Sequence, residues 1–182
     1  MSFYDEKKTV AMLKDPSLKS RAFSAIIERH SEKIYWHIRN MVLSHDDAND
    51  LVQETFIKAW NSIDTFRGES QITTWLYRIA INITLSHLRK REIETVSLDE
   101  ATHDIADSME GDVYFCGERA DALFREAVSN LPEKQRLVFN MRYFEEMMYE
   151  DMSEILDTSV GALKASYHIA VKKIEKFIEE QD

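Results

Sequence analysis

The 182-residue sequence is poor in glycine, proline and cysteine. Four glycines and two prolines are too few for the turns of a many-stranded sheet, which argues against an all-β fold. The single cysteine, Cys116, excludes an internal disulfide and is typical of a reducing compartment. No run of about 18 apolar residues occurs, and the first ten residues are charged where a signal peptide is apolar. We therefore predict a soluble, cytoplasmic protein.

Negative charge is abundant but confined to one segment. The chain carries a formal charge of −10, and residues 92–133, with 12 acidic and 2 basic side chains, alone account for −10. The flanking parts are closer to neutral, and each has a local basic cluster: Arg89, Lys90 and Arg91 before this segment, and Lys164, Lys172 and Lys173 after it. The distribution of charge, not its total, therefore decides whether the protein can approach nucleic acid.

The acidic segment predicts a boundary between two domains. It lacks sustained periodicity and holds two of the four glycines, and repulsion among its carboxylates would keep it extended. We expect one domain over residues 1–92, an acidic linker over 93–118 and a second domain over 119–182. The linker has two interpretations: a solvated tether, or an acidic strand that imitates nucleic acid in a basic channel.

Apolar residues recur at helical spacing, so we predict an all-α fold of two small bundles. In the first half, helices are expected over 5–13, 18–43, the segment that follows Ser44, and 70–91. In the second half they are expected over 120–130, from Pro132 onward, over 149–156 and over 160–178. Ser44 and Ser159 are predicted N-caps, and Asp157 is expected to tolerate a left-handed turn.

The helix predicted over residues 70–91 has two different faces. One is apolar and expected to pack inward: Ile72, Trp75, Leu76, Ile79, Ile83 and Leu88. The other carries polar side chains at steps of three or four: Thr74, Arg78, Asn82, Ser86 and Arg89. Such side chains can donate to base edges and phosphates, although a merely hydrated face is the alternative. Nearby aromatics suit either base stacking or the core: Phe66, Trp75 and Tyr77.

Residues 149–178 have the spacing of a helix-turn-helix, with the short turn DTS between two helices. Apolar residues would hold the two helices together: Ile155, Leu156, Leu163, Tyr167, Val171 and Ile174. The amides that follow Ser159 suit a phosphate. The outward face carries Ala162, Lys164, Ala165, His168 and Lys172. From the residues alone, this segment has two interpretations: a DNA-binding unit or a plain helical hairpin.

Two segments resemble a single protein family. HDDANDLVQETFIKAWNSIDTFRGESQITTWLYRIAINITLSHLRKR closely resembles the promoter-binding domain of bacterial sigma factors of the extracytoplasmic-function (ECF) group. LPEKQRLVFNMRYFEEMMYEDMSEILDTSVGALKASYHIAVKKI is similar to that group's second domain, in the right order and after the right kind of linker. The resemblance implies a sigma factor that binds the β and β′ subunits of RNA polymerase core, opens promoter DNA and has an anti-sigma partner.

The resemblance also implies residue roles. DLVQETF matches a surface that docks on a coiled coil of the polymerase β′ subunit, which gives Asp50, Gln53, Glu54, Phe56 and Trp60. FRGES and TTWLYRIAIN match the part that captures flipped non-template bases, with phosphate contacts just after it: Phe66, Gly68, Ser70, Thr74, Arg78, Asn82, Arg89, Lys90 and Arg91. SVGALKAS matches the recognition helix for the upstream promoter element, which gives Ser159, Lys164, Ser166, His168 and Lys172.

The recognition helix departs from the family pattern. Ala162, Ala165 and Ser166 stand where the family usually has Thr, Ser and Arg, and Ile169 replaces a further Arg. Each lost guanidinium removes contacts worth about 1–3 kcal/mol, so we expect weak or unusual upstream recognition. Alternatively, the small alanines would let the helix approach thymine methyl groups closely.

Two other classes of function are open on the residues alone. A helix-turn-helix regulator with an effector-binding first domain would bind a duplex palindrome as a dimer without polymerase. An enzyme or metal protein would use His30 and His37, seven residues apart on one helix, but no third metal ligand accompanies them. Neither a phosphate-binding glycine loop nor a nucleophile elbow occurs. We predict no enzyme activity, no cofactor and no metal.

Overall fold

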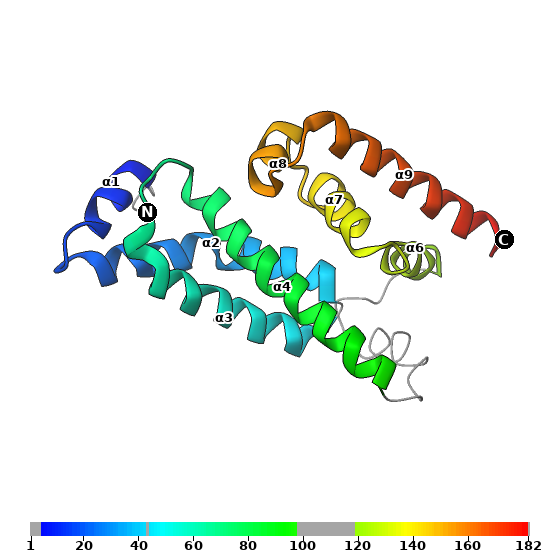
Figure 1. Cartoon of the computed structure of the whole chain (residues 1–182), viewed down its shortest axis with the longest axis horizontal. Coiled ribbons are helices and arrows are strands. Elements are labelled where there is room, and N and C mark those ends of the chain that lie inside the picture. Colours follow the sequence, from blue (N-terminus) through cyan, green and yellow to red (C-terminus); the bar gives the residue numbers. More distant parts are fainter. Residues whose placement is uncertain (1–4, 43, 98–118, 182) are drawn as a thin grey trace.

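The computed structural model describes residues 5–42, 44–97 and 119–181, and no strand occurs in these ranges (Figure 1). The fold is all-α, as predicted. The expected linker, residues 93–118, lies outside the described residues apart from its first five, which continue a helix. Cys116 lies outside them as well. No helix in the described ranges is both long and apolar enough to span a bilayer.

Within the described residues up to 97, the chain forms four α-helices and one short 3-10 turn. These are α1 (Glu6–Leu13), α2 (Lys19–Val42), α3 (His45–Ser62), η1 (Ile63–Thr65) and α4 (Ile72–Ser97). Ser44 caps α3 as predicted, because its hydroxyl oxygen accepts from the Asp47 amide at 3.3 Å. Helix α4 ends at Ser97, six residues beyond the predicted end at Arg91.

The second half consists of α6 (Arg119–Ser129), α7 (Glu133–Tyr143), α8 (Tyr149–Leu156) and α9 (Val160–Glu179). Pro132 is the N-cap of α7 and so lies one position before the helix. Asp157 ends α8 in the left-handed conformation, with φ of 49°. Ser159 caps α9 by accepting from the Ala162 amide. The predicted helix-turn-helix boundaries of α8 and α9 are therefore confirmed.

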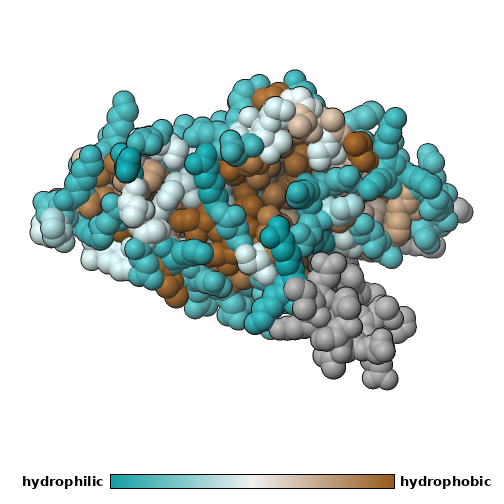
Figure 2. Space-filling view, in the orientation of Figure 1, coloured by the Kyte–Doolittle hydropathy of each residue, from teal (hydrophilic) through white to brown (hydrophobic). Residues whose placement is uncertain are grey.

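The two halves share one hydrophobic core. Residues of α2, α3 and α4 belong to the same buried cluster as six residues of α7, α8 and α9: Leu137, Val138, Met141, Met152, Ile155 and Leu163. In Figure 1, α8 lies beside α4, and α7 packs on α2; Figure 2 shows apolar atoms gathered where these helices meet. The sequence predicted two separate bundles and gave no indication of this contact, while the predicted domain boundaries stay a prediction.

A smaller cluster lies within the second half. It joins α6, α7 and α9 through Ala127, Val128, Leu131, Phe139, Ala170 and Ile174. The Phe139 ring stacks on Tyr143 at 5.1 Å and on Tyr167 at 5.6 Å between ring centroids. Because Tyr167 and Ile174 come from α9, this cluster fixes α9 on α7 and leaves the opposite face of α9 exposed.

Candidate polymerase and nucleic-acid interfaces

Helix α3 presents a continuous exposed stripe. Asp50, Gln53 and Glu54 are exposed, and Ile57 beside them has 61% of its surface exposed. Positions 50, 53, 54 and 57 follow each other at helical steps, so they share one face. Trp60, which is 37% exposed, extends the stripe by one turn. An exposed aliphatic side chain among acidic and amide groups is typical of a surface that docks on a protein partner.

Phe56 differs from the prediction because it is buried. It is 7% exposed, and its ring centroid lies 6.5 Å from that of Phe23 on α2. Trp60 also packs on Phe23, at 5.0 Å, and Lys19 Nζ lies 5.2 Å from the Trp60 ring centroid. Phe56 therefore supports the stripe from beneath. Ile57 is instead the exposed apolar side chain of this stripe. The sequence prediction did not include it, although it follows Glu54 by three residues on the polar face.

The loop between η1 and α4 is tied to the core. Phe66 is half-buried, and its ring lies 5.1 Å from that of Trp75. Gly68 has φ of +76°, a left-handed conformation that favours glycine, and Ser70 is half-buried. The Ile72 amide at the start of α4 donates to Glu6 Oε1 at 2.8 Å. The predicted pocket loop is thus held at one end by the contact of Phe66 with Trp75 and at the other by the hydrogen bond from Ile72 to Glu6.

The polar face of α4 is exposed over most of its length. Asn82, Ser86, Arg89, Lys90 and Arg91 are exposed, and Arg91 Nη1 donates to Asp47 Oδ2 at 3.0 Å. The Arg78 side chain is also exposed, and its Nη2 donates to the carbonyl oxygen of Glu154 on α8 at 2.5 Å.

Thr74 differs from the prediction because it is 6% exposed. A row of residues four apart drifts by about 40° per step around a helix. The row that ends on the surface at Asn82 therefore begins in the interior at Thr74. The Thr74 hydroxyl does not face the surface that Arg78 and Asn82 form.

Helix α9 presents the predicted recognition face to the outside. Ala162, Lys164, Ala165, His168 and Lys172 are exposed, Ser159 is exposed at the N-cap, and Ser166 is half-buried. Ile169 is 45% exposed, so an apolar group stands on this face where the family pattern has an arginine. Lys164 Nζ lies 5.5 Å from the ring centroid of Tyr149. The Ala162 amide donates to Ser159 Oγ, which is the predicted cap; a phosphate contact at this helix end stays a prediction.

The two histidines of the metal alternative have separate surroundings. His37 Nδ1 lies 2.7 Å from Glu145 Oε1, whereas His30 lines a hollow of about 230 Å³ with Glu6, Arg29, Lys33 and Thr73. Burial, helped by the charges of Arg29 and Lys33, lowers the pKa of His30 to about 4. Within the described residues, no group of three or more side chains could hold a metal ion.

Comparison with known families matches both halves of the chain. The sequence model of sigma-70 region 2 matches residues 26–93, and that of sigma-70 region 4 matches residues 121–174. These two segments contain α3, most of α4, α8 and most of α9, which carry the surfaces described above.

Curated relatives cover most of the chain. It is 32% identical to the ECF RNA polymerase sigma-E factor of Haemophilus influenzae, over 87% of this chain and 88% of that protein. It is 30% identical to the RNA polymerase sigma-H factor of Pseudomonas aeruginosa, over 87% of each chain.

Two solved structures have a similar fold. The sigma factor RpoE in complex with the anti-sigma factor NepR from Bartonella quintana has a TM-score of 0.67 and 25% identity, over 86% of this chain and 96% of that one. CnrH in complex with the cytosolic domain of CnrY has a TM-score of 0.71 and 20% identity, over 97% and 99% of the two chains. The second likeness concerns the fold alone.

Proposed function

The chain belongs to the extracytoplasmic-function group of sigma-70 factors, and from this premise we propose which surfaces it uses on polymerase and on DNA. A sigma factor binds RNA polymerase core and directs promoter recognition in transcription initiation. The chain supplies recognition, and polymerase supplies the chemistry of RNA synthesis. We therefore assign it no catalytic role, and we place its action in the cytoplasm, with polymerase.

Docking on the polymerase β′ subunit is assigned to the stripe of α3. The observation that carries this assignment is the exposure of Ile57 among Asp50, Gln53 and Glu54. Burying one isoleucine against a partner stabilises a complex by about 1.5–3 kcal/mol. The two carboxylates pair with basic groups of the partner surface and fix its register, and removing them would leave those partner charges buried without a counter-charge, which weakens the complex.

Capture of the non-template strand is assigned to α4 and the loop before it. Arg78 and Asn82 lie on one exposed face and have the donors that base edges require. Arg89, Lys90 and Arg91 follow on the exposed end of the helix and suit phosphates. Phe66, Gly68 and Ser70 shape the loop that receives a flipped base, whose unstacking costs a few kcal/mol.

Upstream recognition is assigned to the exposed face of α9. Lys164, His168 and Lys172 suit the phosphates and base edges of a major groove, with Ser159 and Ser166 at its start. Ala165 and Ile169 give this face an apolar component that suits thymine methyl groups. Docking on core polymerase raises the local concentration of both DNA-reading surfaces, so neither needs high affinity alone.

An anti-sigma factor is the further partner that we propose. The similar RpoE structure contains an anti-sigma factor, and RpoE is itself described as a sigma factor. We retain the predicted division into a first domain over residues 1–92, an acidic linker over 93–118 and a second domain over 119–182. In this proposal the linker lets the DNA-binding surfaces of α4 and α9 act on the same polymerase.

The docking assignment is tested by binding to purified core polymerase. A variant with Asp50→Ala and Glu54→Ala should lose most of its affinity in fluorescence anisotropy and support no run-off transcript, with its far-UV circular dichroism unchanged. The matched control replaces two exposed acids of α2, Glu28→Ala and Glu32→Ala, and should bind like the wild type. Wild-type affinity in the α3 variant would reject the assignment.

A further inference from the structure

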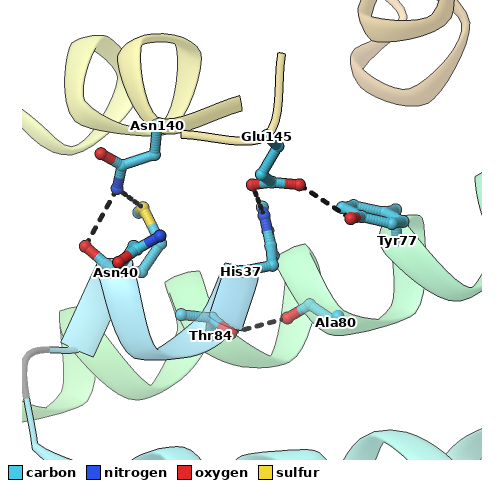
Figure 3. Close-up of polar contacts among 8 residues, drawn as sticks. His37, Asn40, Tyr77, Ala80, Thr84, Asn140 and Glu145 are labelled. Carbon is cyan, nitrogen blue, oxygen red and sulfur yellow. Dashed lines mark hydrogen bonds and ion pairs between the residues drawn. The ribbon is translucent and has the colours of Figure 1, made fainter. Parts of the chain in front are cut away.

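A carboxylate that is largely but not fully buried joins the two halves of the chain. Glu145 follows Phe144, the C-cap of α7, and reaches both α2 and α4 (Figure 3). Its Oε1 lies 2.7 Å from His37 Nδ1, and its Oε2 accepts from the Tyr77 hydroxyl at 2.7 Å. The His37 side chain is 0% exposed and that of Glu145 is 12% exposed. Both carboxylate oxygens of Glu145 are thus satisfied by donors from the first half.

A buried carboxylate has a large desolvation cost unless hydrogen bonds compensate it. Burial and the negative charge of Glu145 raise the pKa of Tyr77 above its ordinary value, so the phenol keeps the proton that it donates. Such charge-assisted hydrogen bonds are about twice as strong as neutral ones. The cost of burying Glu145 is therefore offset only while α7 lies against α2 and α4.

Further contacts close the same interface. Asn140 of α7 is fully buried, and its Nδ2 donates to the Asn40 carbonyl oxygen on α2 at 2.9 Å (Figure 3). Around these polar contacts, Met141, Met152 and Ile155 belong to the core that the halves share. The polar contacts fix which residues meet, because apolar side chains alone pack in several registers.

The closed arrangement affects the three proposed surfaces differently. The stripe of α3 and the outward face of α9 are exposed in it. On α4, by contrast, the guanidinium of Arg78 donates to the Glu154 carbonyl of α8, and the neighbouring Tyr77 is buried. Closure therefore engages the strand-capturing helix and leaves polymerase docking through α3 free.

We propose that Glu145 is an intramolecular latch that holds α7 and α8 on α2 and α4 and restrains strand capture by α4. The latch opens when Glu145 leaves His37 and Tyr77, which frees Arg78 from Glu154. The restraint rests on the proposed function of α4 in strand capture. The latch itself is a property of the free chain and does not require polymerase or DNA.

The latch is tested by a distance measurement on the full chain. Spin labels are attached at Glu32→Cys on α2 and Lys173→Cys on α9, both exposed positions, in a chain with Cys116→Ser. Pulsed electron paramagnetic resonance should show one compact population. Glu145→Ala should increase the population with longer distances about tenfold, because it removes two charge-assisted hydrogen bonds, and Glu145→Gln should have a smaller effect. The control Glu150→Ala, at an exposed acid of α8, should match the parent.

Unchanged distances in both Glu145 variants would overturn the latch, as would the absence of a compact population in the parent. Circular dichroism shows whether each variant folds. If Glu145→Ala does not fold, the distances in Glu145→Gln decide the test, because glutamine keeps the shape and one acceptor of the side chain.

The restraint is tested with a fluorescent single-stranded oligonucleotide that carries the non-template sequence of a promoter mapped by run-off transcription. Glu145→Ala should bind it with a Kd about tenfold lower than the wild type and Glu150→Ala, in line with its larger open population. Equal Kd values would overturn the restraint. Asn82→Ala should weaken oligonucleotide binding both in the wild type and in Glu145→Ala. Unchanged binding in the Asn82 variants would reject the role of α4 in strand capture. The spin-label distances would still decide whether the latch exists.

Discussion

At the scale of single residues, exposure separates supporting groups from contact groups. The docking segment contains two neighbouring apolar residues, and the structure buries Phe56 and exposes Ile57. Sequence similarity indicated the docking segment. It could not show whether Phe56 or Ile57 is exposed, because that depends on the position of Phe23 on α2. Thr74 and Asn82 show the same effect on α4, where one polar row begins inside the protein and ends on its surface.

Ile57→Ala should weaken binding to core polymerase about tenfold or more, which corresponds to about 1.4 kcal/mol per factor of ten. The stability of the free chain should hardly change, because most of the side chain is exposed. Anisotropy titration measures the first effect and urea unfolding the second. Ile27→Ala, at a partly exposed isoleucine of α2, is the control and should leave binding unchanged. Undiminished affinity in Ile57→Ala would remove this residue from the docking surface.

His30 should make the protein less stable in mild acid. Its pKa is about 4 in the folded chain and about 6.5 when unfolded, so the unfolded state takes up the proton first as the pH falls. The contribution of His30 to the free energy of unfolding is therefore fully present above pH 6.5. It is lost as the pH falls toward 4, by up to about 1.4 kcal/mol per pH unit.

Urea unfolding at a series of pH values measures the effect of His30. The variant His30→Gln should have a shallower decline of the unfolding free energy between pH 6.5 and 4. The control His168→Gln changes an exposed histidine of α9 and should retain the wild-type decline. Parallel curves for His30→Gln and the wild type would refute the assignment.

At the scale of elements, most of the architecture was predictable from the sequence. Helix α8 runs over the predicted residues and α9 begins where predicted, because Asp157 and Ser159 mark the turn between them. Both ends of α2 and the C-terminal end of α9 differ from prediction by one residue each. The continuation of α4 to Ser97 was not predicted, because the charges of the segment after Arg91 favoured a linker.

The turn between α8 and α9 offers a test at this scale. Asp157 adopts φ of 49° and ψ of 46°, a conformation that glycine adopts without a Cβ penalty. Asp157→Gly should therefore raise the unfolding free energy by about 0.5–1 kcal/mol. Asp151→Gly, in the first turn of α8, should lower it by about 0.5–1 kcal/mol, because glycine is the poorer helix former and the change removes an acid near the helix N-terminus. Thermal unfolding compares the two, and a destabilised Asp157→Gly would show that the aspartate side chain itself stabilises the turn.

At the scale of the whole molecule, the sequence could not predict how the halves meet. His37 and Glu145 are 108 positions apart, and an apolar stripe shows that a helix needs a cover without showing which helix provides it. The structure shows that contact, and in it the stripe of α3 and the outward face of α9 are exposed. Net charge also has to be considered at this scale, since residues 92–133 hold the acidic excess and the proposed DNA-reading helices have local basic groups.

The central claim is that this acidic chain directs transcription from promoters only as part of RNA polymerase. Run-off transcription with purified core polymerase on genomic DNA fragments tests it most directly. We predict specific transcripts when chain and core are combined and none when either is omitted. Dimeric binding of the chain alone to a duplex palindrome, with no transcript in the presence of core, would contradict the account.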